Sequence, residues 1–201
     1  MLTRAAWHCQ RANVAGGFYY FPMTAVIDAL GEFDGEALIK ALDEQRQQRG
    51  LTWTRLADEL WMQSAELNER LGGDALCPGA LYRTSLRKTM SCQYALPLLR
   101  WLAKAPEDFL HGPVVDVGDA SLPSAGPDKR LRWELSELYA ALDHRRRELE
   151  LTWVLLGEKI GCSPSRLTNL RTARLADLGL VMQLTQWLRQ PAARFIHATD
   201  H

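Results

Sequence analysis

The segment SPSRLTNLRTAR, residues 163–174, holds the side chains whose chemistry is most concentrated in this chain. It contains Arg166, Arg171 and Arg174 and no acidic residue, although the formal net charge of the whole chain is zero. Arginine guanidinium groups suit contacts to phosphate. The amide of Asn169 can form a pair of hydrogen bonds with the edge of an adenine. A solvated helix face would carry the same charges, so a function can be inferred for these residues only from the elements that position them.

Other reactive side chains form no recognisable site. His111, His144, His197 and His201 are scattered, and none has a cysteine or glutamate at metal-ligand spacing. No nucleophile elbow, phosphate loop, dinucleotide fingerprint or pair of catalytic carboxylates is present. The four cysteines lie far apart without a C-x-x-C pair, and we expect free thiols. The sequence therefore predicts no enzyme activity, no metal and no cofactor.

Composition indicates a globular protein. The chain has 201 residues, of which 47% are hydrophobic, enough for one large or two small cores. There is no apolar run of membrane-spanning length and no pattern typical of a secretory signal peptide. We expect a cytoplasmic protein without a membrane partner, associated with the nucleoid if it binds DNA.

The chain contains an internal repeat. ALDEQRQQRGLTW at 41–53 returns as ALDHRRRELELTW at 141–153, and 41–60 matches 141–160 at eight of 20 positions. Both units end alike, with LLRWL and LTQWL, and between them 111–128 carries three prolines and three glycines. The repeat predicts an N-terminal tail at 1–33, a first domain at 34–110, a linker at 111–128 and a second domain at 129–201.

The second unit is predicted to consist of helices alone. Apolar spacing indicates a first helix over 129–149. Thr152 can cap a second helix over 152–160, and Ser163 can cap a third that begins with Pro164. Leucines spaced by four residues indicate a fourth helix, followed by a closing turn over 191–196. The leucines of the first and fourth helices are Leu131, Leu135, Leu138, Leu142, Leu180, Leu184 and Leu188. No strand is expected, so the predicted fold class is all-α.

Residues 151–174 resemble the helix-turn-helix of the lambda-repressor and Cro type. Gly157 takes the small-residue position where the two helices cross, and Gly161 takes the turn glycine. A second helix can project from the surface only if a small residue permits this crossing and a flexible residue forms the turn. The apolar positions of the motif are occupied by Leu156, Ile160, Cys162, Leu167 and Leu170.

The resemblance implies that the helix beginning at Ser163 is a recognition helix. With Leu167 and Leu170 facing inward, its outer face would contact base edges through Asn169 and phosphates through its arginines. The DNA-contacting residues implied in this unit are Thr152, Ser163, Pro164, Ser165, Arg166, Thr168, Asn169, Arg171 and Arg174.

The first unit departs from the motif. LTWTRLADELW at 51–61 matches its first half, with Ala57 at the small-residue position, but Trp61 replaces the turn glycine. The second helix should therefore continue to about Leu71, where Gly72 and Gly73 end it. From LTW to the closing WL, this unit is 14 residues longer than the other. A third helix beginning at Pro78 would offer Gly79, Tyr82, Arg83, Arg87 and Lys88 to DNA.

Together these features predict two tandem lambda-repressor-like helix-turn-helix bundles joined by a Pro/Gly-rich linker. The resemblance implies a transcriptional regulator that binds double-stranded DNA, with the two repeats acting as an intramolecular pseudo-dimer or the chain acting as a homodimer. The alternative is a helical protein-interaction module that uses Trp61 and the elongated helix. Trp53 and Trp153 would either pack on their own first helices or face a phosphate or the other unit; packing is favoured.

Overall fold

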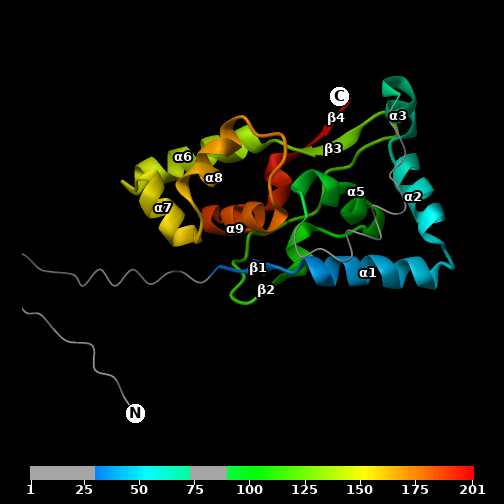
Figure 1. The fold of residues 1–201 in the computed structure, drawn as a ribbon, viewed down its shortest axis with the longest axis horizontal. Helices are drawn as coiled ribbons and strands as arrows, with labels where there is room; N and C mark the ends of the chain where they lie inside the picture. The colour runs from blue at the N-terminus through cyan, green and yellow to red at the C-terminus, as the bar shows by residue number, and fades with distance from the viewer. Residues whose placement is uncertain (1–29, 73–89) are drawn as a thin grey trace, which may run out of the picture.

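The computed structural model describes residues 30–72 and 90–201, and helices dominate it (Figure 1). The first repeat comprises β1 (Glu32–Phe33), α1 (Gly35–Gln48), α2 (Trp53–Met62), α3 (Ala65–Leu71), α5 (Cys92–Leu102), the 3-10 helix η1 (Pro106–Phe109) and β2 (Leu110–His111). The second comprises β3 (Arg130–Trp133), α6 (Leu135–Glu148), α7 (Trp153–Ile160), α8 (Pro164–Thr168), η2 (Asn169–Arg171), α9 (Leu178–Leu188), η3 (Ala192–Phe195) and β4 (Ile196–Thr199).

Two small antiparallel sheets correct the expectation of a chain without strands. β1 pairs with β2, and β3 pairs with β4. The helix expected over 129–149 begins only at Leu135, because Leu131 and Trp133 alternate in burial with Arg130 and Arg132, as strand side chains do. Leu131 lies four residues before Leu135, so the spacing of the leucines alone could not exclude a helix.

Residues that are identical in the two repeats form the same corner in each of them, at the junction between the first and second helices. Nη1 of Arg46 donates to the carbonyl of Leu51 at 2.5 Å, and Nη1 of Arg146 donates to the carbonyl of Leu151 at 2.7 Å. Each guanidinium also lies over the following tryptophan ring, at 4.6 Å for Trp53 and 4.7 Å for Trp153.

The interpretation that these tryptophans pack on their own first helices is therefore confirmed. The ring of Trp153 also stacks on Tyr139 of α6, with 5.3 Å between the ring centroids. Asp43 and Asp143 hold the two arginines in place from the preceding helical turn. The repeated sequence ALD followed by arginine and LTW thus encodes a structural corner.

The repeats face each other across a pseudo-twofold axis. Ser91 and Asp177 form an antiparallel bridge, and they are equivalent positions just before α5 and α9. The amide of Cys92 donates to the carbonyl of Ala176 at 2.8 Å, and the amide of Leu178 donates to the carbonyl of Met90 at 2.8 Å. Correspondingly, α5 contacts β3 while α9 contacts β1. Such reciprocal contacts are the mark of an isologous interface, here formed within one chain.

The segment 111–128 is not a free linker. His111 belongs to β2, and the amide of Val115 donates to Oε1 of buried Gln186 at 2.6 Å. The carbonyl of Pro127 accepts from the amide of Leu67 at 3.2 Å. The segment therefore contacts both repeats, whose buried side chains form a single hydrophobic cluster. The tail expected at 1–33 overlaps a strand at its end, because Glu32–Phe33 forms β1.

The elongated second helix of the first repeat is in fact two helices. α2 ends at Met62, and α3 begins at Ala65 after a break at Gln63 and Ser64. Ser64 is buried, and its hydroxyl donates to the carbonyl of Lys129 at 2.7 Å. This contact to the other repeat places α3 beside the start of β3. As predicted, Gly72 ends α3, with a φ of 62°.

Candidate nucleic-acid interface

Helices α7 and α8 meet at a turn of three residues, 161–163. Thr152 caps α7 by accepting the amide of Leu155 at 3.2 Å. Gly161 ends α7 with a φ of 75°, a left-handed conformation that glycine adopts without strain. The amide of Cys162 then donates to the carbonyl of Gly157 at 2.9 Å. The predicted start and end of α7 are therefore present, and α8 begins with Pro164 as predicted, but the Ser163 side chain makes no cap hydrogen bond to α8.

Gly157 allows the turn to approach α7 closely. A Cβ atom at this position would lie 2.6 Å from the carbonyl oxygen of Cys162. Leu156 and Ile160 are buried beside it, and Leu167 and Leu170 are buried beneath α8 and η2, as predicted. The crossing therefore requires the small residue that the motif places there.

The helix expected over 163–174 is shorter and less regular than predicted. α8 ends at Thr168 and continues as the 3-10 helix η2 to Arg171, so Arg174 lies beyond the helical segment. Side chains three residues apart align on one side of a 3-10 helix, which lets Leu170 follow Leu167 into the core. The helical surface spans two short turns.

Most of the predicted contact residues of this unit are exposed. Pro164 and Thr168 are half-buried. The exposed residues are Thr152, Ser163, Ser165, Arg166, Asn169, Arg171 and Arg174. Asn169 is thus free of covering side chains at the end of α8.

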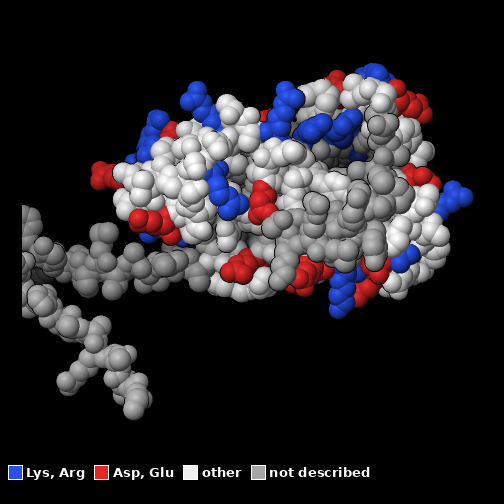
Figure 2. Space-filling view, viewed as in Figure 1, with Lys and Arg blue, Asp and Glu red and all other residues white. Residues whose placement is uncertain are grey.

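The arginines of this surface differ from those of the preceding helix. Arg145 pairs with Glu148, and Arg146 and Arg147 both pair with Asp143. Within residues 30–72 and 90–201, no ion pair forms with Arg166, Arg171 or Arg174. In Figure 2, basic side chains are more frequent along the edge that carries α6, α8 and β3 than along the edge that carries β1 and α1.

The predicted contacts of the first repeat lie outside the described residues. Gly79, Tyr82, Arg83, Arg87 and Lys88 belong to the interval 73–89. On the described side of that interval, α2 continues two residues beyond the end of its counterpart α7, and α3 stands where α7 is followed by a short turn. The two repeats therefore differ at the position where a helix-turn-helix would present its second helix.

Both cysteines in the described part of the chain are free thiols. Burial raises the pKa of Cys92 to about 11. Burial also raises the pKa of Cys162, although the charge of Arg166 lowers it. These pKa directions suit packing rather than nucleophilic chemistry. Cys9 and Cys77, which are also expected to be thiols, lie outside the described residues.

Sequence reasoning overlooked three arginines, one of which lies next to this surface. Arg130 and Arg132 lie on β3, and Arg100 lies on α5. Arg132 also lines a hollow together with Arg174, which connects β3 to the end of the candidate interface. The alternation of arginine with Leu131 and Trp133 was a possible signal of a strand with a basic face, but four residues are too few to distinguish it from a helix.

None of the helices in residues 30–72 and 90–201 has the length and apolar character needed to cross a membrane. Comparison of the chain with protein-family models, curated proteins and solved structures found no match in any of the three.

Proposed function

We propose that this protein binds double-stranded DNA with sequence preference and acts as a transcriptional regulator. The observation that carries the proposal is the exposed set Arg166, Arg171 and Arg174, which forms no ion pair within the described residues and lies on and after the second helix of a braced pair. In a chain of zero net charge, such a local surface supplies the electrostatic attraction that duplex DNA requires.

In the proposed complex, residues 163–171 enter the major groove. Asn169 and Ser165 contact base edges, and the arginines contact the phosphates that flank the groove. Gly157 lets the turn at 161–163 pack closely against α7, which braces the segment from behind. Because η2 is short, the segment contacts the edges of few base pairs, and the remaining affinity comes from contacts to phosphates.

The pseudo-twofold arrangement supports an asymmetric mode of binding. Two-fold dimers of helix-turn-helix proteins bind half-sites about 34 Å apart. Here α7 and α8 have no matching pair in the described part of the first repeat, so one chain offers one such surface. We propose either an asymmetric operator, with residues 78–88 adding contacts, or a homodimer that brings two copies of 163–174 together.

Fluorescence anisotropy with duplexes selected from a random library tests the proposal. Arg166→Ala combined with Arg171→Ala removes two unpaired charges. We expect affinity to fall at least tenfold and the slope of log K against log salt to become less steep by about 1.8, since each phosphate contact contributes about 0.9. Asn169→Ala should change the sequence preference, at a cost of about 1–3 kcal/mol at one position.

A matched control is Arg145→Ala combined with Arg147→Ala, which removes two charges that are already ion-paired. This control should retain most of the affinity. If the two double variants bind equally well, or if the wild type shows no duplex affinity that depends on salt, the proposal is wrong.

A second candidate function is protein interaction. Leu149, Val154 and Leu155 are 45%, 55% and 45% exposed at the corner between α6 and α7, and exposed apolar groups that gather at one place favour a protein contact. Analytical ultracentrifugation tests this function, because Val154→Ser combined with Leu155→Ser should abolish any self-association. A purely monomeric wild type at high concentration would exclude a homodimer through this corner.

A further inference from the structure

A cavity of about 220 Å³ lies between the repeats, beside α3, α5 and β3. We propose that it binds a small oxyanion, a molecule with a phosphate or carboxylate group, through Arg100, Arg130 and Arg132. All three arginines line the cavity, and among the described residues that line it none is acidic. The remaining polar lining includes Ser64 and Asn68.

Among the described residues, none forms an ion pair with these three guanidinium groups. Arg100 donates to Ser64 Oγ at 3.4 Å and to the carbonyl of Ala125, and Arg132 donates to the carbonyl of His201 at 3.4 Å. Nε of Arg130, a donor, is buried without a hydrogen-bond partner in the described residues. A buried donor left unpaired costs about 1–3 kcal/mol. An oxyanion in the cavity would accept from these donors.

Electrostatics favours the same ligand. Burial lowers the pKa of Arg100 and of Arg130, and the neighbouring charge of Arg132 lowers the pKa of Arg130 further. Arginine nevertheless stays protonated in proteins, so the cavity keeps its positive charges. The planar guanidinium matches phosphate and carboxylate geometry, often through two parallel hydrogen bonds. In Figure 2, basic side chains gather in the hollow between α3 and β3.

The arginine cluster is not a by-product of the duplication. The positions equivalent to Arg130 and Arg132 in the first repeat are Leu30 and Glu32, and Gln186 is equivalent to Arg100. The pseudo-twofold axis therefore relates the basic cavity to a hollow beside β1 and α9 that is lined by Glu32 and Asp177 as well as by Arg166. The additional helix α3, which belongs to the longer first repeat, supplies Asn68 to the cavity wall.

The cavity is large enough for a small oxyanion. Its volume of about 220 Å³ is far above the roughly 10–15 Å³ that a cavity needs to hold one water molecule. A phosphate ion, a small phosphomonoester or a short dicarboxylate therefore fits.

Thermal unfolding and isothermal titration calorimetry test the proposal on the full chain. Sodium phosphate and sodium succinate are titrated separately, each against sodium chloride at matched ionic strength. We expect at least one of the two oxyanions to raise the thermal midpoint saturably by several degrees. A response to phosphate alone or to succinate alone identifies the recognised group. If neither acts beyond chloride, the proposal is overturned.

Variants locate the response in the cavity. Arg130→Gln and, separately, Arg132→Gln should weaken oxyanion binding at least tenfold, whereas Arg55→Gln, on a side chain 75% exposed on α2, should retain it. Circular dichroism confirms that each variant is folded. If both cavity variants retain full affinity, the site is elsewhere and the proposal fails. Loss of duplex affinity in Arg130→Gln, without any response of the wild type to either oxyanion, would assign these arginines to the duplex surface instead.

Discussion

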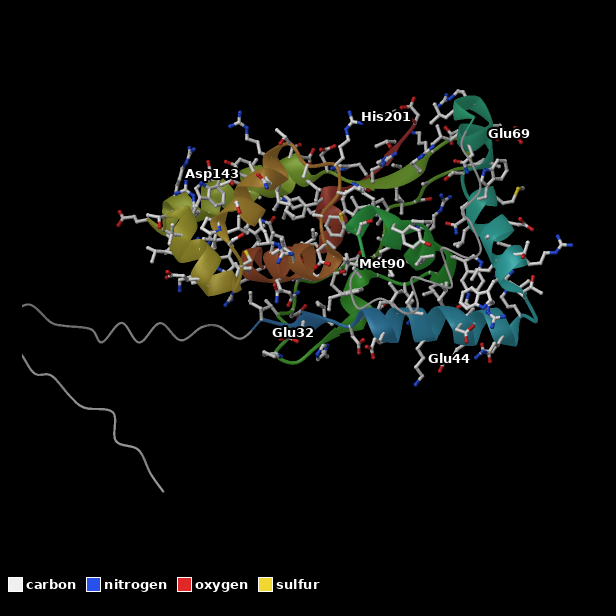
Figure 3. All side chains as sticks on the ribbon, in the orientation of Figure 1. Glu32, Glu44, Glu69, Met90, Asp143 and His201 are labelled. Atoms are coloured by element: carbon white, nitrogen blue, oxygen red, sulfur yellow. The ribbon has the colours of Figure 1, made fainter. Side chains whose placement is uncertain are left out.

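Ser91 and Asp177 pair with each other across an antiparallel bridge while each caps the helix that follows it. The Ser91 side chain accepts from the amide of Tyr94 at 3.2 Å, and the Asp177 side chain accepts from the amide of Leu180 at 3.1 Å. Met90, labelled in Figure 3, lies beside this bridge. The pseudo-twofold axis thus passes between the N-termini of α5 and α9. The two cap residues bring the repeats into contact there.

The side chain of Gln93 forms hydrogen bonds to the second repeat at this interface, and its removal should destabilise the protein. Its Nε2 donates to the carbonyl of Trp133 at 2.8 Å, and its Oε1 accepts from the amide of Trp133 at 3.0 Å. We expect Gln93→Ala to lower the free energy of unfolding by about 1–3 kcal/mol. Urea denaturation measures the loss. The exposed Gln47→Ala serves as control, and equal stability of the two variants would contradict this role.

The contacts of Arg146 at the corner between α6 and α7 predict that lysine cannot replace it without loss of stability. Arg146 bonds Asp143 and the carbonyl of Leu151 and lies over the Trp153 ring, a set of contacts that needs a planar, forked cation. Arg146→Lys should cost about 1–3 kcal/mol of stability. Arg145→Lys, half-exposed on the same helix, should cost less than about 0.5 kcal/mol. Indistinguishable unfolding curves for the two variants would refute the prediction.

Gly157→Ala should destabilise the protein although alanine favours helices. Helix propensity alone predicts a gain of about 0.8–1.0 kcal/mol. The added Cβ would lie 2.6 Å from the Cys162 carbonyl oxygen, and the forced shift should cost about 1–3 kcal/mol. Ala57 is tolerated at the equivalent position because α2 continues through Trp61. Thermal unfolding gives the sign, with the exposed Glu158→Ala as control; a more stable Gly157→Ala would contradict the close approach.

Glu107 should make stability fall as pH rises. Its Oε1 accepts from the amide of Ala192 at 2.7 Å, and burial raises the pKa of this carboxyl. The folded protein therefore retains this proton at a pH where the unfolded chain has lost it. The contribution is fully present below the unfolded pKa of about 4.3 and is lost as pH rises through the raised folded pKa.

Glu107→Gln should remove that part of the pH dependence. The free energy of unfolding of wild type minus that of the variant should therefore decrease between pH 4 and pH 8, as measured by urea denaturation at several pH values. The matched control is Glu69→Gln, on an exposed side chain of α3 (Figure 3), whose difference from wild type should stay flat. A flat difference for Glu107→Gln as well would show that the Glu107 carboxyl is not desolvated.

Local chemistry made much of the fold predictable. Thr152, Gly161 and the leucines at 167 and 170 identified the caps, the turn and the buried face of α7 and α8, because each of these features depends on residues within one or two helical turns. The repeat likewise predicted that Trp53 and Trp153 would occupy equivalent corners. Most of the side chains proposed to contact DNA in the second repeat are exposed for the same reason: they alternate with buried leucines along one short segment.

Tertiary contacts decided the rest. Strands of two to four residues have no periodicity of their own, so β3 became distinguishable from the start of α6 only through its pairing with β4. The segment 111–128 has the composition of a linker, yet Gln186 and Leu67 hold it against the protein. The basic cavity combines Arg100 with Arg130 and Arg132 from the other repeat. Sequence alone thus determined the repeated local motifs, whereas the shared core and the cavity arise from contacts between residues distant along the chain, which no local pattern encodes.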